Sequence, residues 1–114
     1  MPNITAVTNL QGQTTGNSGV TTVTSVVAVT NANHTYKVNA ILIANDSTSA
    51  ATEVDVAFDN GTAYTFVNNV SIPAKASLDV LSSPMYVNNG ESIKVTATSG
   101  VTVVVSYELI DVTT

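Results

Sequence analysis

The last third of the chain contains the pattern that most restricts its fold. From Val101 to Leu109, apolar residues occupy every second position, and polar residues fill most of the positions between them. Side chains that alternate in this way point to opposite faces of a β-strand. Ser99-Gly100 is a turn signal that joins this segment to another alternating segment, Ser92–Thr98. The sequence therefore predicts a C-terminal β-hairpin with one face in a core.

The rest of the chain repeats this strand-and-turn pattern. Val and Thr, which favour strands, make up roughly a third of the residues, and helical periodicity appears nowhere. The expected strands are Val20–Thr30, Tyr36–Asn45, Thr52–Asp59, Thr62–Val70, Ala76–Leu81, Met85–Val87, Ser92–Thr98 and Val101–Ile110. With a short N-terminal segment they make about eight or nine strands, at a spacing of ~8–12 residues. We predict an all-β fold: a single antiparallel β-sandwich with jelly-roll or immunoglobulin-like topology.

The N-terminal 19 residues differ in composition from the remainder of the chain. Their apolar residues are few, and three glycines fall between Gln11 and Gly19. We interpret residues 1–19 as an N-terminal arm or loop, with a short strand or arm over 1–10, and residues 20–114 as the sandwich domain. No secretory signal and no run of ~18 apolar residues occurs, which favours a soluble protein made and assembled inside a cell.

Charge limits the partners. The chain has eight acidic residues, three lysines and no arginine, for a net charge of −5. A nucleic-acid binder needs a basic surface to displace counterions from phosphates, and anionic membranes attract basic surfaces for the same reason. We therefore expect neither nucleic acid nor membrane as a partner. Because cysteine is absent, disulfides and thiolate metal sites are excluded.

Candidate catalytic and metal-binding residues are sparse. His34 is the only histidine and lies in a polar turn, so we expect a surface or turn-capping role. Glu53, Asp55 and Asp59 share a strand face, but successive residues on one face lie ~6.5–7 Å apart, too far to share an ion without a loop. A solvated acidic face is the favoured interpretation, and a cation bridge at a subunit contact is the alternative. With no Gly-x-Ser-x-Gly turn, we predict no enzyme, no metal and no cofactor.

Aromatic residues bear on sugar binding, which many sandwich folds perform. Tyr64, Phe66 and Tyr107 fall on inward-facing positions and are expected in the core. Tyr36 and Tyr86 lie near turns and are candidates for an exposed sugar platform. Carbohydrate recognition is therefore an alternative function.

Several strands are apolar at positions of both parities, as at Val26 and Val27, Ile41 and Leu42, and Val103 to Val105. A sandwich needs one apolar face per sheet, so we expect the surplus to be covered by another subunit. The predicted partner-interface residues are Ile4, Val7, Leu10, Ile41, Ile43, Val104 and Ile110.

Five segments carry a resemblance to a known group, and the region they span, from about Lys37 to Leu109, is roughly two thirds of the chain. They are Tyr36–Asn45, Gly61–Tyr64, Ile72–Ala74, Asn89–Val95 and Val105–Glu108. Together they resemble small β-sandwich virion proteins of tailed bacteriophages, of the head decoration or capsid cement type.

The resemblance implies a non-enzymatic homotrimer that binds the major capsid protein through an extended N-terminal arm. The protein would be assembled in the host cytoplasm and would lie on the outer capsid surface. A net negative charge suits that surface, because the inner wall of a capsid faces packaged DNA. A tail or fibre component that binds host glycans is the alternative. An intracellular β-domain with an unknown small partner is a third possibility.

Overall fold

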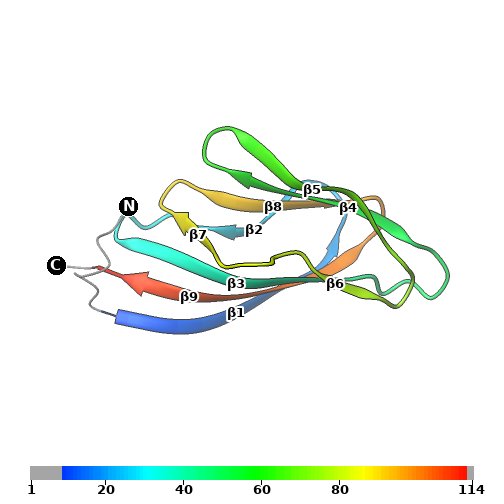
Figure 1. Ribbon diagram of the computed structural model, residues 1–114, viewed down its shortest axis with the longest axis horizontal. Coiled ribbons are helices and arrows are strands. Elements are labelled where there is room, and N and C mark those ends of the chain that lie inside the picture. The colour runs from blue at the N-terminus through cyan, green and yellow to red at the C-terminus, as the bar shows by residue number, and fades with distance from the viewer. Residues whose placement is uncertain (1–8, 113–114) are drawn as a thin grey trace.

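The computed structural model describes residues 9–112, which form nine β-strands in two antiparallel sheets packed face to face (Figure 1). The strands are β1 (Asn9–Val20), β2 (Thr24–Ala28), β3 (His34–Ala44), β4 (Thr52–Asp59), β5 (Ala63–Ile72), β6 (Ser77–Asp79), β7 (Met85–Asn88), β8 (Ser92–Ala97) and β9 (Val101–Asp111). The predicted all-β sandwich is confirmed. Within residues 9–112 there is no helix long and apolar enough to cross a membrane.

The strand order identifies the topology. Sheet A has the order β1-β9-β3-β6, with β7 also paired to β3, and sheet B has the order β2-β8-β4-β5. The first strand pairs with the last, β2 pairs with β8, β3 with β6 and β7, and β4 with β5. This nested pairing is that of a long hairpin folded over on itself, which is a jelly roll. An immunoglobulin-like order, in which the first strand pairs with the second, does not occur among the described strands.

The core lies between the two sheets and is built from the alternation in the sequence. Every odd-numbered residue of β9 from Val101 to Leu109 is buried, as the C-terminal pattern predicts. The facing strand β8 contributes Ile93 and Val95, which are fully buried. Burial of each such side chain contributes about 1.5–3 kcal/mol to folding.

Two β-bulges explain the apolar residues of both parities in β2 and β3. In β3 the register with β9 shifts between Val38 and Ala40, so Asn39 is an extra residue. After this shift Ile41 and Ile43 point into the core and are 0 % exposed, whereas Leu42 points outward. The expectation that Ile41 and Ile43 contact another subunit is therefore wrong, because a bulge reverses the strand's inward parity.

The second bulge lies in β2. The register with β8 shifts between Ser25 and Val27, and the extra residue, Val26, is buried together with Val27 in the same core. The surplus apolar residues of β2 are thus covered within one chain.

The N-terminal segment departs furthest from expectation. Residues 11–19, predicted as a loop, belong to β1, which pairs with β9 in unbroken register from Asn9↔Asp111 to Asn17↔Val103. The ladder forms through backbone groups and so does not require apolar alternation. Residues 1–8 of the predicted arm, with Ile4 and Val7, lie outside the described residues.

Candidate functional site

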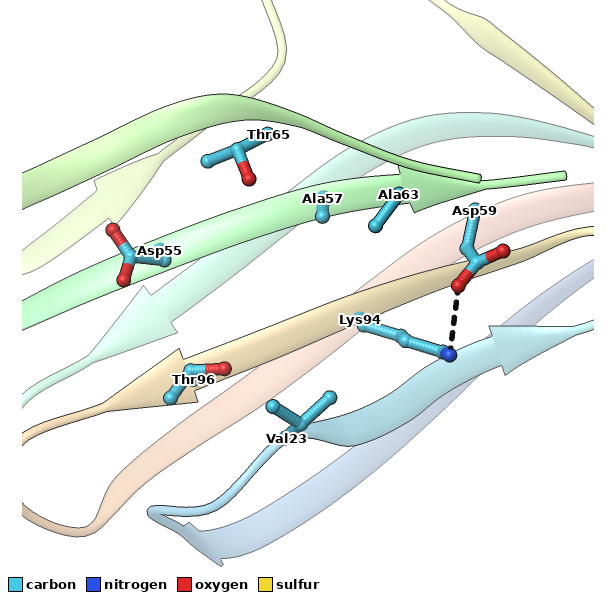
Figure 2. Close-up of a pocket in the computed structure, with 8 residues that line it drawn as sticks. All are labelled: Val23, Asp55, Ala57, Asp59, Ala63, Thr65, Lys94 and Thr96. Atoms are coloured by element: carbon cyan, nitrogen blue, oxygen red, sulfur yellow. Dashed lines mark hydrogen bonds and ion pairs between the residues drawn. The ribbon is translucent and has the colours of Figure 1, made fainter. Parts of the chain in front are cut away.

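A hollow lies on the outer face of sheet B (Figure 2). Its volume is about 270 Å³, and its lining residues come from β4, β5, β8 and the segment before β2: Val23, Asp55, Ala57, Asp59, Ala63, Thr65, Lys94 and Thr96. The space exists because Ala57 and Ala63 present only methyl groups between the longer polar side chains, as Figure 2 shows. The hollow therefore has a small apolar floor and a polar rim.

An ion pair closes one end of the hollow. Lys94 Nζ lies 2.8 Å from Asp59 Oδ2, and the backbone N–H of Gly61 donates a hydrogen bond to Asp59 Oδ1 at 2.8 Å. The hydrogen bond from Lys94, followed by the one from Gly61, lowers the pKa of Asp59 below its ordinary value of 3.8. Gly61 has φ of +109°, a conformation that suits glycine in a tight turn. Asp59-Asn60-Gly61 thus begins the hairpin turn that joins β4 to β5.

The second carboxylate of the hollow is also held in place by the chain. The backbone N–H of Asn69 donates to Asp55 Oδ1 at 2.6 Å. Asn69 has φ of +51° and lies where the register of β5 with β4 shifts. Asp55 therefore fixes an irregular part of the edge strand β5, in addition to lining the hollow.

The predicted acidic face of β4 exists, and its three residues play separate parts. Glu53 is exposed, Asp55 binds the β5 backbone, and Asp59 pairs with Lys94. Among residues 9–112, no group of three or more His, Cys, Asp or Glu residues is arranged to hold a metal ion. His34 lies outside the hollow at the start of β3, with Nε2 3.6 Å from Asp111 Oδ2.

The aromatic residues divide differently from the sequence prediction. Tyr64 and Phe66, expected in the core, are 57 % and 39 % exposed, because β5 is the edge strand of sheet B and its faces are only partly covered. Tyr36 stacks on Tyr107 with ring centroids 4.5 Å apart and packs against the core. Tyr107 is buried as predicted and Tyr86 is exposed, but no aromatic side chain lines the hollow.

A second candidate surface is the outer face of sheet A. Three neighbouring rows across β1, β9 and β3 carry no charged side chain, and we call them the central patch. The rows, read from the strand pairing, are Gly16–Val104–Leu42, Thr14–Ser106–Ala40 and Thr102–Ala44. Leu42 is 44 % exposed and Val104 is half-buried beside it. The patch is composed mainly of small side chains and is apolar at its centre. Two carboxylates border it: Asp79 pairs with Leu42 from β6, and Asp46 accepts a hydrogen bond from Thr102.

The predicted interface residues occupy several different environments. Ile41 and Ile43 lie in the core, and Ile110, at 5 % exposure, is already buried within the chain. Val104 lies in the central patch and Leu10 is exposed on β1. Leu42 is among the exposed apolar residues that the predicted interface did not include. Only the bulge at Asn39 reveals it, and no local sequence signal marks that bulge.

Comparison with known proteins adds no relative. No family model, curated protein or solved structure matches this chain. Function is therefore inferred from the fold and from the two surfaces above.

Proposed function

We propose that this chain is a non-enzymatic structural protein of a tailed-bacteriophage virion, which decorates and cements the capsid by bridging subunits of the major capsid protein. It is assembled in the host cytoplasm as a homo-oligomer and lies on the outer capsid surface. The observation that supports this role best is the central patch, three adjacent uncharged rows on the outer face of sheet A.

The chemistry of the patch suits contact with another protein. The buried centres of protein interfaces are depleted of charge, and small side chains allow two surfaces to approach closely. Leu42 and Val104 supply apolar area at the centre of the patch. Charged side chains lie on the outer faces of both sheets: Asp59 and Lys94 on sheet B, and Lys37, Glu108 and Asp79 around the central patch on sheet A. The central patch is thus an uncharged area bordered by charges, like the core and rim of a protein interface, which favours binding through sheet A.

The jelly-roll topology is compatible with this proposal. Viral capsid proteins, lectins and cupins all have jelly-roll folds, so the fold alone does not distinguish a capsid protein from a sugar-binding protein. The mechanism is mechanical: a protein bound across neighbouring shell subunits adds interface area, and the shell resists internal pressure better. Because β1 begins at Asn9, residues 9–19 of the predicted arm belong to the sandwich.

The test is binding to shells assembled from the major capsid protein of the bacteriophage to which this proposal assigns the chain. We expect the unmodified protein to cosediment with shells and to appear on their outer surface by electron microscopy. Leu42→Lys places a charge in the central patch and should lower shell occupancy. Val23→Lys is the matched control, because Val23 is 64 % exposed on the other sheet. Absence of the unmodified protein from shells, or equal binding by both variants, would contradict the proposal.

The alternative is a tail or fibre module that binds host glycans. The hollow supports it, since two carboxylates, an amine and two hydroxyl side chains surround it. Against it, the hollow has no aromatic residue on which a sugar ring stacks. A glycan array distinguishes the two functions: binding that is lost in Asp55→Asn favours the hollow, and binding lost in Tyr86→Ala favours the exposed aromatic residue of sheet A. Tyr36→Ala is unsuitable because Tyr36 packs against the core.

A further inference from the structure

The free edge of β1 has the properties of a site for strand pairing. β1 is the longest strand among residues 9–112, with 12 residues, and only one of its edges is paired, to β9. In an antiparallel ladder alternate residues direct both their N–H and C=O groups to the opposite edge. From Asn9 to Asn17 the register is unbroken, so every second residue there presents an N–H and a C=O at the free edge.

The other edges of the described strands are protected in ways that β1 lacks. In sheet A the opposite edge consists of β6 and β7, with three and four residues. In sheet B, β2 has five residues and a bulge, and β5 has two register shifts. Short strands, bulges, prolines and charges are the devices that prevent edge-to-edge association. β1 contains no charge and no proline, and its single irregularity lies near its end, between Asn17 and Val20.

The sequence of β1 indicates which partner fits this edge. From Gln11 to Asn17 the strand is chemically nearly palindromic about Thr14, so an antiparallel copy centred there would place like residues together over this segment. Gly12 would face Gly16, Gln11 would face Asn17 and Gln13 would face Thr15 of the second copy. The inner-face pairs combine amides with amides or hydroxyls, and the outer-face glycines give no steric conflict.

Charge also favours antiparallel pairing. The residue beside Gly12 on β9 is Glu108, whereas the residue beside Gly16 is the uncharged Val104. An antiparallel copy centred on Thr14 brings the Glu108 side of one chain against the Val104 side of the other. Two acidic regions therefore do not meet, although each chain carries a net charge of −5.

We infer that β1 pairs with β1 of a second copy of this chain, antiparallel and centred on Thr14, to form a two-fold dimer with one continuous sheet. This arrangement differs from the homotrimer implied by the sequence resemblance, and it does not depend on what the protein binds. A two-fold interface uses the same patch on both chains, as this self-complementary strand requires. Both central patches then lie on one side of the extended sheet.

A charge exchange at Thr14 tests the pairing and its register. The unmodified protein should form a concentration-dependent dimer by sedimentation equilibrium over about 1 μM to 1 mM. Thr14→Lys and Thr14→Glu each place like charges opposite one another across the two-fold axis and should weaken the dimer about fivefold or more. An equimolar mixture of the two variants should recover a dimer, because Lys and Glu then face each other.

The controls separate pairing from folding and from capsid binding. Thr14 is exposed, so both variants should keep the circular dichroism spectrum and unfolding midpoint of the unmodified protein. Thr62→Lys and Thr62→Glu make the same changes in the exposed β4–β5 turn and should leave the dimer unchanged. A monomer at all concentrations, a trimer, or a dimer indifferent to Thr14 would overturn the inference. Because the assay contains no shells, its outcome is independent of the capsid proposal.

Discussion

Tyr107 Oη donates a hydrogen bond to Gln13 Oε1 at 2.7 Å, which links the last strand of the fold to the first across 94 residues of sequence. The Tyr107 ring is 6 % exposed and stacks on Tyr36 in the core. Gln13 is half-buried on β1, a strand without apolar alternation. The hydrogen bond therefore connects the polar strand β1 to a core residue of β9, in addition to the backbone hydrogen bonds between these two strands.

Removal of this hydrogen bond should weaken the fold modestly. Tyr107→Phe keeps the stacked ring and deletes only the hydroxyl, so we expect the free energy of unfolding to fall by about 1 kcal/mol. Gln13→Ala should cost a similar amount, and the double variant should cost less than the sum of the two. Urea denaturation followed by circular dichroism measures all three. Strictly additive effects would show that the two side chains do not interact.

Tyr107 should also make the protein sensitive to alkali. Burial, together with the neighbouring Tyr36, raises the pKa of Tyr107 above its ordinary value of 10.0. Above pH 10 the unfolded chain loses this proton more readily than the folded chain, so the contribution to stability is present below pH 10 and declines as pH rises through the folded-state pKa. Tyr107→Phe should show a shallower alkaline loss of stability than the unmodified protein. Parallel curves for the two proteins would contradict this expectation.

Adjacent residues on β3 should differ sharply in their effect on stability. Ile41 is 0 % exposed, and Ile41→Ala should lower the free energy of unfolding by about 2–5 kcal/mol. Leu42 is 44 % exposed on the central patch, so Leu42→Ala should cost less than about 1 kcal/mol. Urea denaturation measures both values. The reverse order would mean that the bulge at Asn39 does not reverse the strand.

The same pair shows where prediction from sequence stops. Alternation places most of the strands within a few residues, because one face of each is buried and its apolar positions recur every second residue. A bulge interrupts this rule by one residue, and neither Asn39 nor Val26 differs from its neighbours in a way that announces it. The apparent surplus of apolar residues in β2 and β3 therefore results from the two bulges. Val104, where the register is regular, faces outward as parity predicts.

The candidate hollow was partly predictable for a related reason. The acidic face of β4 is a direct result of the alternation of Glu53, Asp55 and Asp59. The position of Lys94 is not, because it depends on the pairing of β8 with β4, which brings together segments 35 residues apart. The sequence did not predict most of β1. Its ladder with β9 is made by backbone groups, and a segment of Gly, Gln, Thr, Asn and Ser shows no apolar alternation.

Asn45, which directly follows the last residue of β3, should be critical for the stability of that end of the sandwich. It is 1 % exposed, and its Nδ2 donates to the carbonyl oxygens of Ala50 and Ile72 at 2.9 and 3.0 Å. Its Oδ1 accepts from the N–H of Ser47 at 3.1 Å. Asn45→Ala leaves these groups without their partner and should lower the free energy of unfolding by about 2–4 kcal/mol.

The control for Asn45 is Asn33→Ala, at an exposed turn position, which should change the free energy of unfolding by less than about 0.5 kcal/mol. Urea denaturation again provides the measurement. Similar costs for the two variants would show that the hydrogen bonds of Asn45 do not support the fold.

Acid should weaken the protein through Asp59. Hydrogen bonds from Lys94 and from the Gly61 backbone lower the pKa of Asp59 in the folded chain below 3.8, the ordinary value expected when the chain is unfolded. The unfolded chain therefore takes up this proton first as pH falls, so the contribution to stability is present above pH 3.8 and is lost as pH falls through the folded-state pKa.

Asp59→Asn should lower stability at neutral pH and flatten the acid limb of the stability curve measured by urea denaturation. Glu53→Gln, which removes an exposed carboxylate from the same strand face, should leave that limb in place. If both variants flatten it equally, general charge repulsion rather than the Asp59–Lys94 pair governs the response to acid.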